Sequence, residues 1–212
     1  FQRAAATAQN SRIGTGGAAH RMGGASGWVD HGHHALMRLN RFQAVGGYDE
    51  SFSHNEDAEL DLRLSRAGAR IWLEASLSVD YLPRRGALSL FRQYLNYGRG
   101  RAKTLRRHRQ SLRPRQVLPL AVLPSVAAAL MGLILSPIHP TWLLLAAPAL
   151  AWAAACLAGG AAAAVKSGAG PCGWLAGPVA MIMHLAWSIG FFRGMAERQN
   201  GRTTQTLVQL DR

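Results

Sequence analysis

The second half of this 212-residue chain lacks charge of almost every kind. Residues 117–192 contain no Asp, no Glu and no Arg, and Lys166 is their only lysine. Ala, Leu, Val, Ile and Trp dominate the stretch, which holds three long apolar runs at 117–135, 141–165 and 173–192. Each run approaches the ~20 residues that an α-helix needs to cross the hydrocarbon layer of a membrane. We therefore expect transmembrane helices within 116–194 and a polar tail at 195–212, rather than a helical hairpin buried in a soluble core.

Acidic residues are also absent between Tyr81 and Gln116, where eleven Lys and Arg residues occur. This cluster accounts for much of the net charge of +13 and directly precedes the first apolar run. Basic clusters beside a membrane segment are attracted to anionic lipid and tend to stay on the cytoplasmic side. A sequence pI near 11.4 also occurs in nucleic-acid-binding proteins, but the position of the charge favours a membrane. We predict a basic interfacial helix at 84–115, an anionic lipid membrane as partner, and no nucleic acid.

The chain has only two cysteines, Cys156 and Cys172, and both lie in the apolar tail. Two cysteines at this spacing form neither a disulfide framework nor a metal-binding pattern. We interpret them as small apolar residues.

Turn and capping signals divide the remaining polar part of the chain. We expect a helix at 1–10, a glycine-rich loop at 14–27, a strand at 28–39, a helix at 41–45 capped by Asn40, and strands at 69–73 and 78–82. A longer helix spans 87–108, where Leu88, Phe91 and Leu95 form an apolar stripe that suits a helix at a membrane surface.

The most distinctive motif begins at Asn55, a predicted N-cap, and ends at Gly68. Glu56 and Asp57 occupy the first turn of the helix, where the positive end of the helix dipole favours an anion. Acids at this position commonly do no more than complement the dipole. Glu59 and Arg63 are spaced i, i+4, which predicts a surface ion pair of about 0.3–0.5 kcal/mol.

A second motif, Gln93-Tyr-Leu-Asn-Tyr97-Gly-Arg99-Gly-Arg101, lies on the long basic helix. Gln93 and Tyr97 are four residues apart and share a face that differs from the apolar stripe, so we expect them at the surface. Arg99 and Arg101 can bind phosphate oxygens through their guanidinium groups, and lipid headgroups offer the same chemistry.

Together the two motifs resemble the processive and lipid-linked members of glycosyltransferase family 2, above all the succinoglycan-type exopolysaccharide glucosyltransferases. That family's pattern of Glu-Asp-x-Glu-Leu, then Arg, then Ala-Gly is matched at 56–60, Arg63 and 67–68. Its second pattern, Gln-x-x-Arg-Trp, is matched at Gln93, whereas Asn96 and Tyr97 replace the Arg and the Trp. The similarity runs from residue 1 to about residue 109.

This resemblance implies an α/β fold of the nucleotide-sugar transferase type (GT-A), with residues 1–83 as the C-terminal half of the catalytic domain. The family's nucleotide-binding half and its Asp-x-Asp metal motif have no counterpart in the chain, so we expect a longer enzyme. Mg²⁺ or Mn²⁺ would then be held mainly by the missing N-terminal part. The resemblance assigns the catalytic base to Asp57, a supporting role to Glu56, and contacts with diphosphate and acceptor to Gln93 and Tyr97.

The run Asp30-His31-Gly32-His33-His34 is unusual. On a strand, His31 and His33 share one face, and Asp30 and His34 share the other. Two histidines at i, i+2 can bind a metal, but a strand that lines the acceptor cleft is the simpler interpretation. We expect Asp30, His31 and His33 to contact the acceptor and leave metal binding by the histidines open.

We therefore expect an inverting glycosyltransferase in the inner membrane, with its catalytic part in the cytoplasm. It would move a hexose from a nucleotide-diphosphate sugar to a lipid-linked saccharide or an exopolysaccharide. The alternatives are an inert membrane-anchoring subunit of a polysaccharide export complex and a transferase acting on a free lipid.

The number of membrane spans stays open. Three spans would place the C-terminal arginines outside, against the positive-inside rule. Pro119 and Pro124, however, could make the first run re-entrant.

Overall fold

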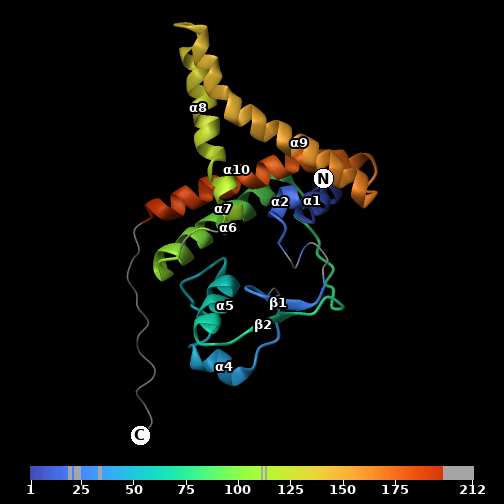
Figure 1. The fold of residues 1–212 in the computed structure, drawn as a ribbon, viewed down its shortest axis with the longest axis vertical. Coiled ribbons are helices and arrows are strands. Elements are labelled where there is room, and N and C mark those ends of the chain that lie inside the picture. The colour runs from blue at the N-terminus through green and yellow to red at the C-terminus, as the bar shows by residue number, and fades with distance from the viewer. Residues whose placement is uncertain (19–20, 22–24, 33–34, 111, 113, 198–212) are drawn as a thin grey trace.

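The computed structural model describes residues 1–18, 21, 25–32, 35–110, 112 and 114–197. Figure 1 shows a hairpin of two long helices on one side of a helical layer, and a small unit with the two strands on the other. The helices are α1 (Gln2–Gln9), α2 (Arg12–Thr15), α4 (Leu39–Ala44), α5 (Glu56–Arg66), α6 (Ala87–His108), α7 (Pro114–Leu120), α8 (Val122–Leu135), α9 (Ala147–Ser167) and α10 (Ala176–Ala196), with 3₁₀ segments η1 (Pro140–Ala146) and η2 (Pro171–Leu175). The strands β1 (Gly27–Val29) and β2 (Ile71–Leu73) pair antiparallel, with Trp28 opposite Trp72.

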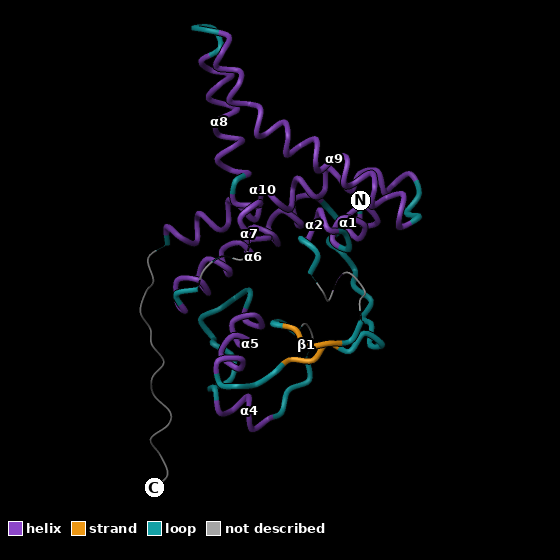
Figure 2. Tube along the Cα trace, in the orientation of Figure 1, coloured by secondary structure: helices purple, strands orange, loops and turns teal. Residues whose placement is uncertain are grey.

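The helical layer is built on α6 and α10, which lie side by side along most of their length (Figure 2). A Cβ atom added to Gly98 would lie 2.1 Å from the carbonyl oxygen of Trp187, and one added to Gly190 would lie 1.9 Å from that of Leu95. The two backbones are therefore in direct contact, which residues with a side chain would prevent.

The first helix of the chain completes this layer. Ala4, Ala5 and Ala8 of α1 are fully buried in one cluster with Leu90 of α6 and Met183 of α10. Small alanine side chains let α1 approach both helices closely, so the start of the chain and its third apolar run share one core.

The hairpin consists of α8, η1 and α9 and is far more exposed than α10. Three segments are long and apolar enough to cross a membrane: Gln116–Leu135, Pro140–Ser167 and Pro171–Ala196. Only 11% of the apolar window is buried in each of the first two, against 50% in the third. These apolar helices indicate a membrane protein, as the sequence predicts.

Several predicted elements are confirmed. The long basic helix has the expected bounds, α1 lies within 1–10, and α5 begins after Asn55. Gly68 follows the end of α5 with φ +80°, the left-handed conformation that glycine adopts readily at a helix C-terminus. The side chain of Asn55, however, does not cap α5; its amide donates to Thr104 Oγ1 of α6 at 3.3 Å.

Other predictions are wrong. The strand expected at 28–39 ends at Val29, because its partner β2 supplies only three residues in register. In the described part of the chain, 78–82 pairs with no strand at all. The short helix α4 starts at Leu39 with Arg38 as N-cap, so Asn40 lies inside it. With two three-residue strands the described fold is mostly helical, and the GT-A-type fold stays a prediction.

That the stripe of Leu88, Phe91 and Leu95 lies at a membrane surface stays a prediction. Leu88 is 62% exposed, whereas Leu90, Gln93, Ala102 and Leu105 are buried. The side of α6 that packs against α10 is set by glycines on both helices: Gly98 lies against the backbone of Trp187, and Gly190 lies against the backbone of Leu95.

Candidate functional site

The carboxylate of Asp57 lies at the N-terminal end of α5, where this helix meets α6. The residues just before α5 lie against Gly100 of α6: a Cβ atom there would be 2.5 Å from the carbonyl oxygen of His54. Asp57 is partly exposed, with 35% of its side chain accessible, and its Oδ1 accepts from the Ala58 amide at 2.7 Å. A glycine in the second motif thus lets the first motif dock on it.

His31 lies between two carboxylates of α5. Its Nδ1 is 2.6 Å from Oδ2 of Asp61, and its Nε2 is 3.9 Å from Oδ2 of Asp57. Asp61 is 2% exposed and also accepts from the Gly32 amide at 2.9 Å. Asp61 thereby fixes the imidazole ring so that its other nitrogen faces Asp57, because a carboxylate that bonds one ring nitrogen of a histidine sets the orientation of the other.

Glu59 is fully buried, contrary to the surface pair that the spacing predicts. It does pair with Arg63, at 2.7 Å, but it also contacts Nε2 of His108 at 2.7 Å. Arg63 donates further to the carbonyl oxygens of Val45 and Gly47, at 2.6 and 2.7 Å. This network ties α5 both to the end of α6 and to the segment after α4.

Gln93 lines a cavity of about 250 Å³ on the side of α6 that faces α5. This volume is below the ~300–1,000 Å³ typical of a pocket for a whole small ligand, and suits a diphosphate or one sugar ring. The described residues that line it include two guanidinium groups and no carboxylate, which favours an anion. They are His54, Arg84, Ser89, Arg92, Gln93, Asn96 and Tyr97.

Gln93 is 8% exposed, so the surface position predicted for it is wrong. Its Nε2 donates to the hydroxyls of Tyr81 and Tyr97, at 3.0 and 2.9 Å. Its Oε1 is buried and has no hydrogen-bond partner among the described residues, and the same holds for Oε2 of Glu56. Buried acceptors without a partner are uncommon and can mark the place of a ligand.

The hydroxyl of Tyr97 is suited to donate a hydrogen bond. Burial, with a smaller contribution from the neighbouring Tyr81, raises the pKa of Tyr97 above its usual value. The phenol therefore stays protonated at neutral pH, and while its oxygen accepts from Gln93 its proton can be donated to a bound group.

His54 connects the cavity to α5. Its Nε2 is 3.4 Å from Nδ2 of Asn96, and its ring lies 6.4 Å from that of Tyr97. Because His54 precedes Asp57 by three residues, the structure brings the two sequence motifs together, as a shared active site requires.

The arginines of the second motif are placed elsewhere. Arg99 pairs with Glu197 at 2.8 Å, and Arg101 donates to Gln116 at 3.3 Å. Neither lines the cavity of Gln93, where Arg84 and Arg92 are found instead. The prediction that Arg99 and Arg101 contact the diphosphate is therefore not supported by the geometry; both face the end of α10 and the start of the apolar tail.

The histidine run is only partly described. Asp30 is exposed just after β1, and His31 is placed by Asp61 rather than by strand alternation, because β1 has ended. His33 lies outside the described residues. Within the described part of the chain, no three His, Cys, Asp or Glu side chains are grouped to hold a metal ion.

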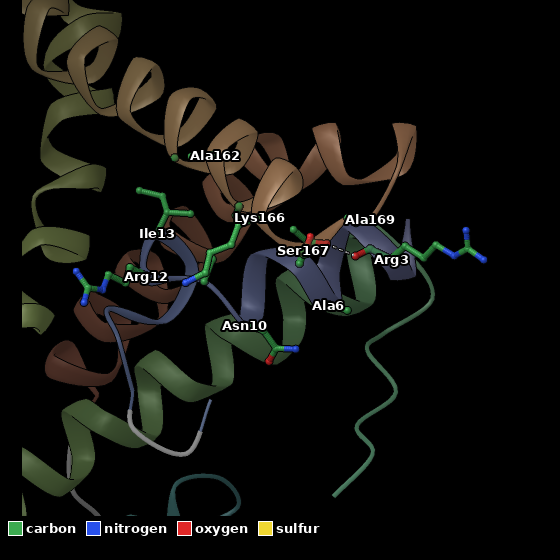
Figure 3. Close-up of a pocket in the computed structure, with 14 residues that line it drawn as sticks. Arg3, Ala6, Asn10, Arg12, Ile13, Ala162, Lys166, Ser167 and Ala169 are labelled. Carbon is green, nitrogen blue, oxygen red and sulfur yellow. Dashed lines mark hydrogen bonds between the residues drawn. The ribbon is translucent and has the colours of Figure 1, made fainter. Parts of the chain in front are cut away.

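A larger cavity of about 1240 Å³ lies between α1, α2 and the end of α9 (Figure 3). No carboxylate is among the described residues that line it. Small residues such as Ala162 form part of its wall, and Figure 3 shows Arg3 extending away from the other labelled side chains. Without a described carboxylate to serve as a base, this cavity is a weaker candidate for the active site than the region of Asp57 and Gln93.

Sequence reasoning missed four residues of the candidate site. Asp61 follows Asp57 by four residues, the spacing that places both on one helical face, and Arg92 lies next to Gln93. His54 directly precedes Asn55 of the first motif, and Arg84 belongs to the basic cluster, but only the fold brings them to the cavity.

Comparison with known proteins yields one informative relative. No family model and no solved structure matches the chain. The succinoglycan biosynthesis protein ExoA of Rhizobium meliloti (strain 1021) is 51% identical over 197 residues, which cover 93% of this chain. The chain spans only 57% of that protein's length. The predicted resemblance to succinoglycan-type proteins is thereby confirmed: the chain is a homologue of the succinoglycan biosynthesis protein ExoA.

Proposed function

We propose that this chain forms the acceptor-side and membrane part of a glycosyltransferase of exopolysaccharide biosynthesis. The enzyme would move a hexose from a nucleotide-diphosphate sugar to a lipid-linked saccharide or a growing polysaccharide. The observation that carries this proposal is the contact between the two motifs: His54, just ahead of Asp57, touches Asn96 and Tyr97 in the cavity of Gln93. A carboxylate and an anion-binding cavity are thus adjacent, and the name of the homologue supports the same context.

The chemistry is a single inverting displacement. Asp57 accepts the proton of the acceptor hydroxyl as its oxygen attacks the anomeric carbon, and the diphosphate leaves with the bonding electrons. General base catalysis of this kind contributes about 10²–10⁴-fold. Arg84 and Arg92 counter the charge on the leaving diphosphate, and Gln93 and Tyr97 hold its oxygens or those of a sugar.

A divalent cation, Mg²⁺ or Mn²⁺, is part of the proposal but not of the site described above. The described residues do not offer a set of ligands for it. We therefore assign its ligands to other parts of the enzyme, and the proton transfer to Asp57 does not depend on it. We propose an inner-membrane location with α5 and α6 in the cytoplasm, where basic segments are retained.

Two other functions remain as alternatives. A membrane-anchoring subunit of an export complex would need the apolar helices. It would not need the buried acceptor oxygens of Gln93 and Glu56 that lack a hydrogen-bond partner among the described residues. A transferase that acts on a free lipid would use the same site with a different acceptor. Analysis of the reaction product distinguishes the lipid from the saccharide acceptor.

Removing the hydroxyl group of Tyr97 should impair transfer more than it impairs folding. We expect Tyr97→Phe, like Gln93→Ala, to lower kcat/KM. The corresponding loss of transition-state stabilisation is about 1–3 kcal/mol, the scale of a lost hydrogen bond to a charged group. Because Gln93 is buried, Gln93→Ala should also destabilise the protein, by about 1–3 kcal/mol. Steady-state transfer of a radiolabelled hexose, together with thermal unfolding in detergent, measures both effects.

Tyr94→Phe is the matched control. Tyr94 also accepts from a glutamine, Gln9 Nε2 at 3.3 Å, but it does not line the cavity. This variant should keep kcat/KM within about twofold, the change expected where no contact to the substrate is lost. Equal losses of activity in Tyr94→Phe and Tyr97→Phe would mean that the cavity is structural only.

The apolar helices should hold the protein in the membrane independently of charge. High salt and alkaline carbonate should both leave the chain in the membrane pellet, since salt screens only the electrostatic contribution. Leu130→Arg on the exposed side of α8 should lower the integrated fraction, because Arg in a membrane-spanning helix costs about 2.5–3.5 kcal/mol near its centre. Leu36→Arg, at a fully exposed leucine outside the apolar helices, should have no effect. Release of the unmodified chain by carbonate would contradict membrane integration.

A further inference from the structure

We infer that α10 lies along the membrane surface, paired with α6, and that α8 and α9 are the helices of the described chain that cross the bilayer. By length and composition alone α10 could also span. Its packing against α6 excludes this orientation, and the argument rests on the register of the two helices.

The two helices run parallel and stay in register from end to end. Near their N-termini, Leu90 of α6 shares a cluster with Val179 and Met183 of α10. Near their C-termini, Arg106 donates to the carbonyl oxygen of Gly194 at 3.1 Å. With 21 residues, α10 is about 31 Å long, and each of its turns has a turn of α6 beside it at the same depth.

A spanning α10 would therefore carry α6 into the hydrocarbon layer. Ionised side chains in that layer are rare and strongly unfavourable unless they reach an interface or a partner. Among the cations of α6, Arg99 pairs with Glu197 and Arg107 pairs with Asp49, but both arginine side chains are about 40% exposed, so these pairs lie in contact with the surroundings of the protein. The six cations are Arg92, Arg99, Arg101, Lys103, Arg106 and Arg107.

The cavity of Gln93 gives a second argument. It lies on α6 beside the middle of α10, since Leu95 faces Gly190 and Gly98 faces Trp187. A spanning orientation would place this polar cavity within the hydrocarbon, closed to any water-soluble anion. A surface orientation keeps it open to water.

An anionic bilayer surface fits the paired helices. Leu185, Ile189 and Phe192 are spaced i, i+4, i+7 along α10 and are only partly covered by protein, so they can enter the headgroup region to the ~5–10 Å depth usual for interfacial helices. The cations of α6 then lie within reach of anionic headgroups. Lys166, near the end of α9, would lie at the same headgroup depth. It lines the cavity beside α2 in Figure 3.

The direction of the hairpin agrees with two helices, α8 and α9, that cross the bilayer. In Figure 1, α8 leaves the α6–α10 layer, and α9 returns to it before α10 begins. Both ends of α10, including Arg193 in its last turn, then stay on the side of α6, as the positive-inside rule favours. The sequence leaves the number of spans open, with Pro119 and Pro124 as the reason why the first run could be re-entrant. Pro119, however, lies in α7, ahead of the projecting α8, and Pro124 lies in the first turn of α8, where proline is tolerated. The third run takes the non-spanning role instead.

Cysteine accessibility in the full-length gene product tests this topology. In a background with Cys156→Ala and Cys172→Ala, single cysteines replace Leu36 in the loop before α4, Ile138 at the tip of the hairpin, or Ala196 at the end of α10. A membrane-impermeant maleimide is applied to right-side-out cells and to inside-out vesicles. Labelling after denaturation confirms that each cysteine is reactive.

We expect the cysteine at 196 to react from the same side as that at 36, and the cysteine at 138 to react from the opposite side only. Reaction at 196 from the side of 138 would mean that α10 spans the membrane and would overturn the inference. Protection of 196 from both sides would place it inside the bilayer and would overturn it as well. Reaction of 138 on the side of 36 would show that the hairpin does not cross.

Discussion

Asp57→Asn is expected to lower kcat for hexose transfer by at least about 10²-fold, while binding of the nucleotide sugar changes little. A general base acts in the transition state and contributes little to the ground-state complex. Asparagine keeps the size of the side chain and its acceptor for the Ala58 amide, but it cannot take a proton. Steady-state kinetics with a radiolabelled nucleotide-diphosphate sugar measure the effect.

Asp80→Asn is the control for this change. Asp80 is an exposed aspartate in the segment before α6, outside the cavity of Gln93. Its replacement removes the same charge and should leave kcat unchanged. Retention of more than about a third of wild-type kcat by Asp57→Asn would remove this residue from the role of base, because even the weakest general bases contribute more.

Glu59→Ala should cause the largest loss of stability, about 3–5 kcal/mol, as expected when one partner of a buried ion pair is removed. The change would leave Arg63 without its carboxylate, and His108 of α6 would lose its contact with α5. The midpoint of thermal unfolding in detergent should fall by many degrees, and α5 should become accessible to proteases.

Glu197→Ala provides the comparison at an exposed ion pair. Glu197 pairs with Arg99 at 2.8 Å, but both side chains are about 40% exposed, and exposed pairs contribute about 0–1 kcal/mol. If Glu59→Ala and Glu197→Ala have the same midpoint of thermal unfolding, the buried network does not hold α5 to α6.

Local signals were sufficient for the helices that carry the motifs. Gly68 and the acids at the start of α5 give its bounds, and the run from Ala87 to His108 contains neither proline nor acid, so α6 is predicted at its full length. These signals act within one helix and do not depend on the rest of the fold.

The burial of α6 depends on a helix far along the chain and could not be predicted. Gly98 leaves space for the backbone of α10, and Gly100 leaves space for the segment before α5. Gln93 is buried among Tyr81 and Tyr97, and no pattern within α6 predicts these contacts. The same holds for the small strands: β1 is limited by the length of β2, not by its own residues. The carboxylate motif was recognisable, but its link to the cavity through His54 required the structure.

The most direct test of the central claim is transfer itself. Membranes that contain the full-length gene product are incubated with radiolabelled nucleotide-diphosphate hexoses, and the label is followed into lipid-extractable and polysaccharide fractions. With at least one donor we expect incorporation that is absent from membranes without the protein and that falls at least about 10²-fold in Asp57→Asn. A folded, membrane-integrated protein that transfers no hexose from any donor, or that transfers equally well with Asn at position 57, would contradict the account and favour the anchoring subunit.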